Sequence, residues 1–548
     1  MNESPLSFFR SHSFLTWAGL SLSAVLLFFS FGPIGHPFLA FFALLPAILL
    51  SHLQPEWKTW LRASFTVSWL LWIALLIWLR HVYPPLGYVG LVFLTAYCAL
   101  YLFGWLVALR WIYPSINQSP LWARCLVILG LAGAWGVGEW IRGNILTGFG
   151  WLPLAATQET NPVILSLCAW VGPYGLSALI VLVNLGFARW INRLIHFRKE
   201  LHEVGPATPM TWFSRITPEL YLGLAPLGLS FILYANSFSE SASTLPSTTR
   251  FSSGIVQTDF DPNAKWDAHR LNSHLHQITL HTIEAAKPNS QGQRPDFVLW
   301  PEAALPISLE NKIYLQILTQ LAKTTQTTLI IGVIDKRGTG YANGVAVITP
   351  EGLQSPIYAK RHLVPFGEYV PFANYLPLRK VVPIQEDCVA GQDIAHLNLT
   401  TQRGEKIKAG ALVCYEDVFP SLGREHALAG AQLMIVVTND AWYGREAGAY
   451  QHNAHSVLLA AATGIPILRC GNAGWSGFID SRGRMTALTQ GEDPTIYFSG
   501  SGRIGPVAVK GENTPPTFWV KQGDFAIALG GLFFALTAFW RRQQKSNS

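Results

Sequence analysis

The chain has 548 residues, of which 50% are hydrophobic and 13% are charged. Soluble domains carry roughly 25% charged residues, so this composition excludes an ordinary soluble protein and favours one that crosses a membrane. The net charge of +7 does not indicate a nucleic-acid partner, because the basic residues flank apolar blocks rather than forming one interleaved stripe.

Apolar blocks long enough to cross a bilayer occupy most of residues 14–234. A membrane-spanning helix needs about 20 predominantly apolar residues. The chain offers eight candidate blocks: 14–32, 35–53, 62–79, 88–109, 121–141, 163–188, 217–234 and 524–540. The first block could instead be a signal peptide, but no small-residue cleavage site follows it. We therefore expect about eight retained helices.

Basic residues in the short loops predict the orientation of these helices. The loops 33–34, 80–87 and 142–162 hold only two arginines, whereas the intervening segments and the C-terminal tail are basic. Because positively charged loops stay in the cytoplasm, both termini are expected inside and residues 235–523 outside. This pattern predicts a multi-pass protein of a bacterial inner membrane whose large loop faces the periplasm.

The outside segment has the pattern of an α/β domain. Short apolar runs such as 297–300, 329–334 and 433–437 are typical of strands buried on both faces. Segments with helical spacing, such as 267–287 and 450–463, lie between such runs. The predicted organisation is a transmembrane domain, a Ser/Thr-rich linker, a periplasmic α/β sandwich, and a last helix with a basic cytoplasmic tail: 1–234, 235–253, 254–520 and 521–548.

Three side chains of complementary chemistry follow strand ends in this domain. They are Glu302, Lys360 and Cys414. A cysteine reacts as the thiolate, and Glu302 is suited to accept its proton. Lys360 is suited to stabilise the oxyanion that forms when the thiolate attacks an acyl carbonyl, an effect of about 3–4 kcal/mol per donor. The three residues together predict acyl transfer through a thioester.

Each of these residues also has an ordinary structural explanation. Cys414 could be a buried packing thiol, Glu302 a helix cap, and Lys360 a solvated loop charge. A Cys–His pair is disfavoured because the nearby histidines sit at turn and helix positions: His362, His452 and His455.

The remaining cysteines do not predict a metal site. No pair of cysteines has metal-ligand spacing. An oxidising compartment would allow a disulfide between Cys388 and Cys470, although their spacing alone does not predict one.

The candidate residues lie in three distinctive segments, Trp300–Glu302, Lys360–Pro371 and Cys414–Glu416, and Thr438–Gly444 follows the next strand. These segments resemble the motifs of the nitrilase superfamily, and most closely those of its membrane-bound apolipoprotein N-acyltransferase family. The resemblance extends into the membrane part through residues 139–152. It implies an α-β-β-α sandwich carried on about eight helices.

The resemblance also implies a role for each residue. Cys414 would be the nucleophile, Glu302 the general base and Lys360 the oxyanion stabiliser. Supporting or substrate-binding roles are implied for five further residues: Glu368, Tyr415, Glu416, Trp266 and Asn343. The implied reaction is ping-pong. An acyl chain leaves a phospholipid for Cys414 and then passes to the α-amino group of an apolipoprotein's diacylglyceryl-cysteine.

The same resemblance implies no cofactor and no metal, because the donor ester is already activated for thioester exchange. The expected partners are the phospholipid donor, the diacylglyceryl-modified apolipoprotein and the lipid bilayer, with no nucleic acid, and the protein is expected to be a monomer. A wide crevice for acyl chains is also expected, with candidate aromatic lining residues at six positions: Trp266, Tyr369, Phe372, Tyr375, Trp442 and Tyr443.

The sequence departs from the family pattern in places that flank the expected pocket. They are Gly150, 445–452, 455–463 and 469–476. Two alternative functions stay open. One is a membrane-tethered amidase or nitrilase, in which water resolves the thioester, and the other is a non-catalytic scaffold that presents lipoproteins.

Overall fold

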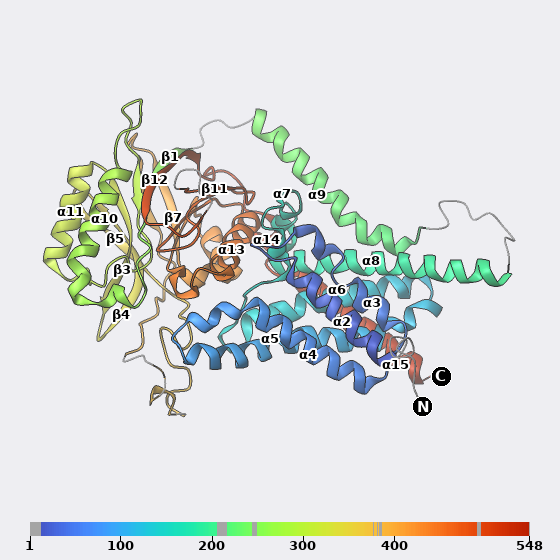
Figure 1. The fold of residues 1–548 in the computed structure, drawn as a ribbon. Helices are drawn as coiled ribbons and strands as arrows, with labels where there is room; N and C mark the ends of the chain where they lie inside the picture. Colours follow the sequence, from blue (N-terminus) through green and yellow to red (C-terminus); the bar gives the residue numbers. More distant parts are fainter. Residues whose placement is uncertain are drawn as a thin grey trace. The chain divides into compact units, whose positions relative to one another are not determined.

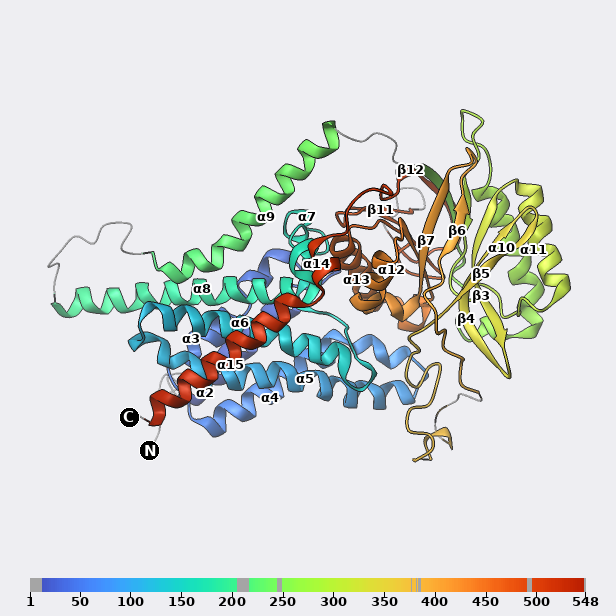
Figure 2. The same ribbon diagram turned by 180° about the vertical axis from the view of Figure 1, so that it is seen from behind.

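The computed structural model describes residues 12–204, 216–243, 249–375, 377–380, 382, 386–489 and 495–546. The chain forms two compact units (Figures 1 and 2). One is helical and comprises Met1–Glu240 with Gln522–Ser548. The other is mixed and comprises Ser241–Lys521.

The helical unit is built from eight α-helices of seven or more residues in its described part. They are α2 (His12–Phe28), α3 (Leu45–Ser51), α4 (Trp57–Leu75), α5 (Leu86–Ile112), α6 (Leu121–Asn144), α8 (Cys168–Val204), α9 (Pro218–Ser243) and α15 (Phe525–Ser546). Helix α6 packs closely on α15, because Gly133 meets Gly530 where an added Cβ would lie 2.5 Å from the facing Cα. Such small-residue contacts are typical of helices packed within membranes.

Five helical segments of the described chain are long and apolar enough to cross a membrane. They are Leu86–Ile116, Leu121–Thr147, Cys168–Ile195, Pro218–Asn236 and Phe525–Gln544. Two shorter apolar stretches are Ser13–Phe28 and Pro37–Ser51. The expected count of eight is therefore not supported by helix length and composition.

The predicted span 35–53 differs most from a single helix. It contains a 3-10 turn, η1 (Pro37–Phe41), followed by the seven-residue helix α3. Pro46 lies in the first turn of α3. A proline there cannot donate to residue 42 and its ring crowds that carbonyl, so a continuous helix through this point is disfavoured.

The mixed unit contains two six-stranded sheets (Figure 2). The first has the order β12 (Gly500–Ala508), β1 (Arg250–Gln257), β2 (Phe297–Leu299), β3 (Thr328–Arg337), β4 (Gly340–Thr349) and β5 (Gly352–Ala359). The second has the order β11 (Met485–Ala487), β10 (Gly477–Ile479), β9 (Ile467–Gly471), β8 (Leu433–Thr438), β7 (Lys406–Val413) and β6 (Leu397–Thr400). In each sheet three central strands run parallel, and the outer strands are antiparallel.

The two sheets pack face to face around one core. Alternate residues of both sheets meet in it, among them Ile255, Ile330, Val413, Ile435 and Leu468. The opposite face of the first sheet packs on α10 (Leu271–Ala285) and α11 (Lys312–Thr325) (Figure 1). Helices α12 (Pro420–Leu428) and α13 (Ala447–Thr463) accompany the second sheet. The expected α-β-β-α sandwich is confirmed.

Candidate active site

Cys414 stands where strand β7 ends. It is the first residue of the 3-10 turn η10 (Cys414–Val418), and its φ of 53° is in the left-handed region. Residues other than glycine adopt this conformation rarely, and they do so most often at functional sites. The side chain belongs to the core between the sheets but keeps 8% of its residue surface exposed. Cys414 is therefore a buried residue at the end of β7.

Glu302 is held by backbone packing just after β2. Trp300 anchors the segment, since its indole donates to the Thr282 hydroxyl at 2.9 Å. A Cβ on Gly332 would lie 2.2 Å from the Pro301 carbonyl oxygen, so only glycine allows this approach. No helix follows until α11, and the interpretation of Glu302 as a helix cap is therefore wrong.

Lys360 is buried rather than solvated. The residue is 1% exposed, and its Nζ lies 2.9 Å from Glu368 and 4.0 Å from Glu302 Oε1. Burial lowers the pKa of Lys360, but the two carboxylates outweigh burial and raise it above its ordinary value. The interpretation of Lys360 as a solvated loop charge is therefore wrong, and the amine is a permanent cation.

Asn343 joins the two carboxylates. Its Nδ2 donates to Glu302 Oε1 at 2.6 Å and lies 3.3 Å from Glu368 Oε1. Its backbone carbonyl accepts from the Lys360 N–H at 2.7 Å. The second Glu368 oxygen accepts from the Val364 N–H at 2.8 Å. We call Glu302, Asn343, Lys360 and Glu368 the Glu–Lys cluster.

The thiol of Cys414 is electrostatically coupled to this cluster. Burial and the Glu302 carboxylate raise the pKa of the Cys414 thiol, while the Lys360 cation lowers it. The balance is upward, so the resting thiol is protonated. A protonated thiol, a carboxylate and a buried cation are thereby coupled to one another.

Lys265 is a second buried cation that the sequence patterns did not reveal. It lies in the short turn η7 (Ala264–Trp266), is 2% exposed, and donates from Nζ to the Glu302 carbonyl oxygen at 2.9 Å. Burial lowers its pKa to about 8, against the opposing effects of Glu302 and Cys414. Only its position next to Trp266 could have drawn attention to it. Trp266, the residue expected to contact substrate, is 55% exposed.

Glu416 connects the turn η10, which begins at Cys414, to the chain around Lys360. Its carboxylate accepts from the backbone N–H groups of Val413, Arg361 and His362 at 2.7–3.1 Å, and from the Tyr358 hydroxyl at 2.9 Å. A carboxylate with these donors holds both segments in register. Burial nevertheless raises the pKa of Glu416.

Tyr415 and His362 pack into an aromatic group with Phe419. The ring centroid of Phe419 lies 4.9 Å from that of Tyr415 and 3.8 Å from that of His362. Tyr415 is 7% exposed. This neighbour of the nucleophile therefore packs within the turn that follows Cys414.

The other two cysteines of this unit are free thiols. Cys470 lies in the core between the sheets, where its Sγ contacts the Val256 carbonyl at 3.2 Å. Cys388 is partly buried. The structure therefore contains no Cys388–Cys470 disulfide. Among the described residues, no group of three His, Cys, Asp or Glu is placed to hold a metal ion.

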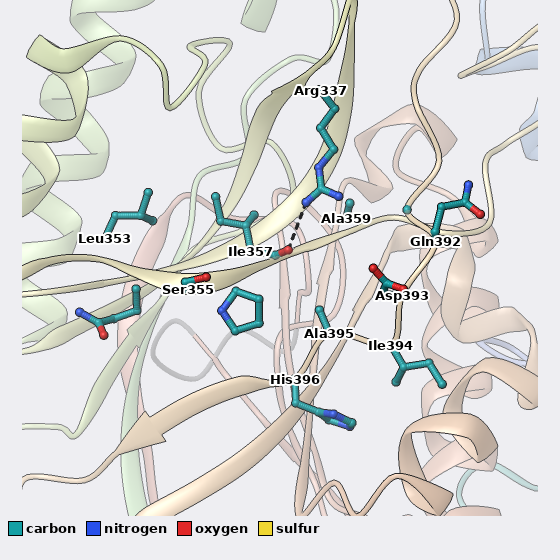
Figure 3. Close-up of a pocket in the computed structure, with 13 residues that line it drawn as sticks. Arg337, Leu353, Ser355, Ile357, Ala359, Gln392, Asp393, Ile394, Ala395 and His396 are labelled. Carbon is teal, nitrogen blue, oxygen red and sulfur yellow. Dashed lines mark hydrogen bonds between the residues drawn. The ribbon is translucent and has the colours of Figure 1, made fainter.

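A cavity of about 660 Å³ lies at the edge of β5 (Figure 3). Its lining includes Ser355, Asp393 and His396, and Arg337 donates to the Ile357 carbonyl at 3.3 Å beside it. No side chain of the Glu–Lys cluster lines it. Its lining does include Ala359, which precedes Lys360, and Gly391, whose N–H donates to the Lys360 carbonyl at 2.8 Å.

Two family profiles match the chain. The profile described as carbon-nitrogen hydrolase matches residues 265–499. The profile described as apolipoprotein N-acyltransferase N-terminal domain matches residues 23–186. Fold and site together thus define a carbon-nitrogen hydrolase domain joined to a unit of apolar helices.

Full-length relatives make the assignment narrower. A protein of Geobacter metallireducens named apolipoprotein N-acyltransferase is 30% identical over 545 residues, which cover 95% of each chain. One of the same name from Allorhizobium ampelinum is 31% identical over 459 residues, or 78% of each chain. The chain belongs to the apolipoprotein N-acyltransferase family, and the resemblance of its motifs is confirmed.

A solved amidase from Nesterenkonia sp. is similar to part of the chain. It is 17% identical, aligns with 53% of this chain and 98% of its own, and has a TM-score of 0.35. A score this low adds nothing to the family match.

Proposed function

We propose that this protein transfers a fatty acyl chain from a phospholipid to the α-amino group of the N-terminal diacylglyceryl-cysteine of apolipoproteins. Family membership supports the overall reaction. The observation that carries the mechanism is the buried thiol of Cys414 beside a carboxylate and a cation. These are the groups that thioester-forming acyl transfer requires.

The first half-reaction acylates Cys414. Glu302 takes the thiol proton, and the thiolate attacks the ester carbonyl carbon of the phospholipid. Lys360 donates to the resulting oxyanion, since its ammonium is already fixed by Glu368. The carbon–oxygen bond then breaks, and Glu302 returns the proton to the lysophospholipid alkoxide as it leaves.

The second half-reaction forms the amide. The α-amine of the acceptor attacks the thioester carbonyl and loses a proton to Glu302. Lys360 again stabilises the oxyanion, the carbon–sulfur bond breaks, and Cys414 recovers its proton. Every proton moves between Glu302, Cys414 and the two substrates, so the proposed cycle uses no cofactor and no metal.

Four residues support these steps without reacting. Glu368 and Asn343 orient Lys360 and Glu302 through the contacts described above. Glu416 joins the nucleophile turn to the chain beside Lys360. Lys265 holds the main chain of the base. Trp266 and Tyr415 are proposed to contact or shape the lipid site, which is supported by the exposure of Trp266.

The cellular setting is also proposed. The apolar helices are those of a membrane protein. The distribution of basic loops supports an inner-membrane location, cytoplasmic termini and a periplasmic catalytic unit. The phospholipid donor then comes from the surrounding bilayer, and the protein acts as a monomer.

The test is to incubate the purified full-length protein with a phospholipid labelled in its acyl chain. A label on Cys414 that is released by hydroxylamine is expected, and it should pass to a diacylated lipopeptide that is added next. Release of labelled free acid without transfer would support the amidase alternative. Equal labelling of the Cys414→Ala variant would contradict the mechanism.

A further inference from the structure

A second group of charged side chains lies next to the nucleophile turn, and the proposed reaction does not use it. It comprises Asp417 of η10, Asp440 of η11 (Asp440–Tyr443), His452 of α13 and Arg469 of β9. We call these four residues the ion cluster. All four side chains are 0% exposed. They come from four separate elements, so only the tertiary fold brings them together.

Each aspartate contacts both cations. His452 Nε2 lies 2.8 Å from Asp417 Oδ1, and His452 Nδ1 lies 2.7 Å from Asp440 Oδ1. Arg469 lies 2.5 Å from Asp417 Oδ2 and 3.3 Å from Asp440 Oδ2. Two anions and two cations thus alternate within one buried group.

The contacts of His452 favour its charged form. A neutral imidazole has one N–H and one lone pair, and a lone pair would repel a carboxylate oxygen at this distance. Both ring nitrogens lie within 2.8 Å of carboxylate oxygens, which favours the doubly protonated, charged ring. Burial alone would lower the pKa of His452, but Asp417 and Asp440 outweigh burial and raise it to about 9.

The other polar groups around the His452 ring do not change the balance between two negative and two positive charges. The Tyr443 ring of η11 packs on His452, and burial raises the pKa of its hydroxyl, so it stays neutral. Ser456 of α13 donates to Asp417 at 2.5 Å. The ion cluster therefore has no net charge.

The ion cluster is linked to Cys414 along two routes. Asp417 lies three residues after Cys414 in the same turn. The Thr438 hydroxyl donates to Asp440 at 2.8 Å, and Thr438 also lowers the pKa of the Cys414 thiol. An unneutralised carboxylate here would oppose a thiolate, and Asp440 already raises the pKa of the thiol.

We propose that His452 and Arg469 are positioning residues whose charges cancel those of Asp417 and Asp440, so that the Cys414 thiolate can form beside them. This inference rests on the proposed role of Cys414 as nucleophile. It gives His452 a fixed electrostatic role in place of proton transfer. It also explains why two aspartates can lie buried next to a group that must become an anion.

The test measures how fast iodoacetamide alkylates Cys414 between pH 6 and 9 in the full-length protein, by mass spectrometry of the Cys414 peptide. His452→Gln leaves one buried negative charge in excess. We expect the alkylation rate at a given pH to fall about tenfold, which corresponds to one pKa unit of the thiol. The double variant His452→Gln/Asp440→Asn restores neutrality and is expected to recover most of the rate.

Charge and packing predict opposite results for the double variant. If the ion cluster only packs the core, a second substitution should slow alkylation further, and that result would overturn the proposal. His455→Gln is the matched control, because it makes the same change at a buried histidine of the same helix outside the ion cluster. It is expected to leave the pH profile of alkylation unchanged.

Asp440→Asn alone is a second test, which does not depend on whether His452→Gln folds. It removes an anion without leaving one unpaired, so alkylation is expected to be faster than in the wild type. An unchanged or slower rate would overturn the proposal. Alkylation needs no lipid, so this result stands apart from the acyl-transfer assay. If the variants show the predicted alkylation rates but the wild type transfers no acyl chain, the proposed function is contradicted and the role of the ion cluster is not.

Discussion

Two groups of buried charge adjoin Cys414, and they are built differently. In the Glu–Lys cluster, Lys360 stays 4.0 Å from Glu302, and the carboxylate side chains of Glu302 and Glu368 remain 10% and 14% exposed. In the ion cluster, every side chain is 0% exposed and every ion pair is 3.3 Å or shorter.

The difference agrees with the roles that we propose for the two groups. A base that gains and loses a proton must be reachable by substrate and must not be locked in a close ion pair, because its charge changes during the reaction. A group that only supplies a constant field is most effective when its geometry is fixed and water is excluded.

The largest effect is expected from Cys414→Ala. Without the thiol no thioester can form, so transfer from phospholipid to lipopeptide should fall by about 10³-fold or more. Quantifying the labelled acyl-enzyme and the acylated lipopeptide checks this. Cys388→Ala, which removes another free thiol of the same unit, should keep its activity. Loss of activity in that control alone would assign the nucleophile to Cys388.

Glu302→Gln should follow with a loss of about 10²–10⁴-fold in the rate of acyl-enzyme formation. The amide preserves the shape of the side chain and its contact with Asn343 but cannot accept the thiol proton. Glu310→Gln is a suitable control, since Glu310 pairs with Lys336 at the surface of the same unit. Equal rates for the two variants would remove Glu302 from the chemistry.

Lys265 should control the alkaline side of the pH profile. Its pKa is lowered to about 8, so the cation is present below that pH and is lost as the pH rises through it. The rate of acyl-enzyme formation is expected to fall over the same range. Lys265→Arg keeps the charge and should move the fall to higher pH, whereas Lys265→Met should reduce the rate by about tenfold. If the rate of Lys265→Arg falls over the same alkaline pH range as that of the wild type, this role of Lys265 is contradicted.

The charge of His452 should also affect the stability of the folded protein. The pKa of His452 is raised from 6.5 to about 9 in the folded protein. The folded state therefore holds its proton more tightly, and the resulting stabilisation is complete below pH 6.5 and lost as the pH rises through about 9. Its size is at most about 3 kcal/mol. The thermal midpoint of the wild type should fall towards that of His452→Gln across this interval. A difference between the two that is independent of pH would show that the ring carries no charge.

Most of the buried strands could be predicted from the sequence, but the outer strands could not. Continuous apolar runs such as 433–437 correspond to β8, because a strand covered on both faces has no polar side to alternate. Strand β12 went unrecognised because it is an edge strand that carries polar, glycine and proline residues. Strand β12 pairs with β1, although more than half of the sequence of the mixed unit lies between them. No local sequence signal indicates such a pairing.

The site was predictable to a similar extent. Glu302, Lys360 and Cys414 follow strand ends, and their local motifs are distinctive. Lys265 and the ion cluster were missed, since a lysine in a surface-like segment and isolated aspartates carry no periodic signal. Their burial depends on elements that are distant in sequence.

The sequence by itself therefore determined the class of protein, the apolar helices and the three reactive residue types, because hydropathy and short motifs are local properties. Only the tertiary structure decided which charges surround Cys414 and which of them are balanced. Electrostatic effects depend on distance and burial, and in this protein both are set by the packing of η7, η10, η11, α13 and β9.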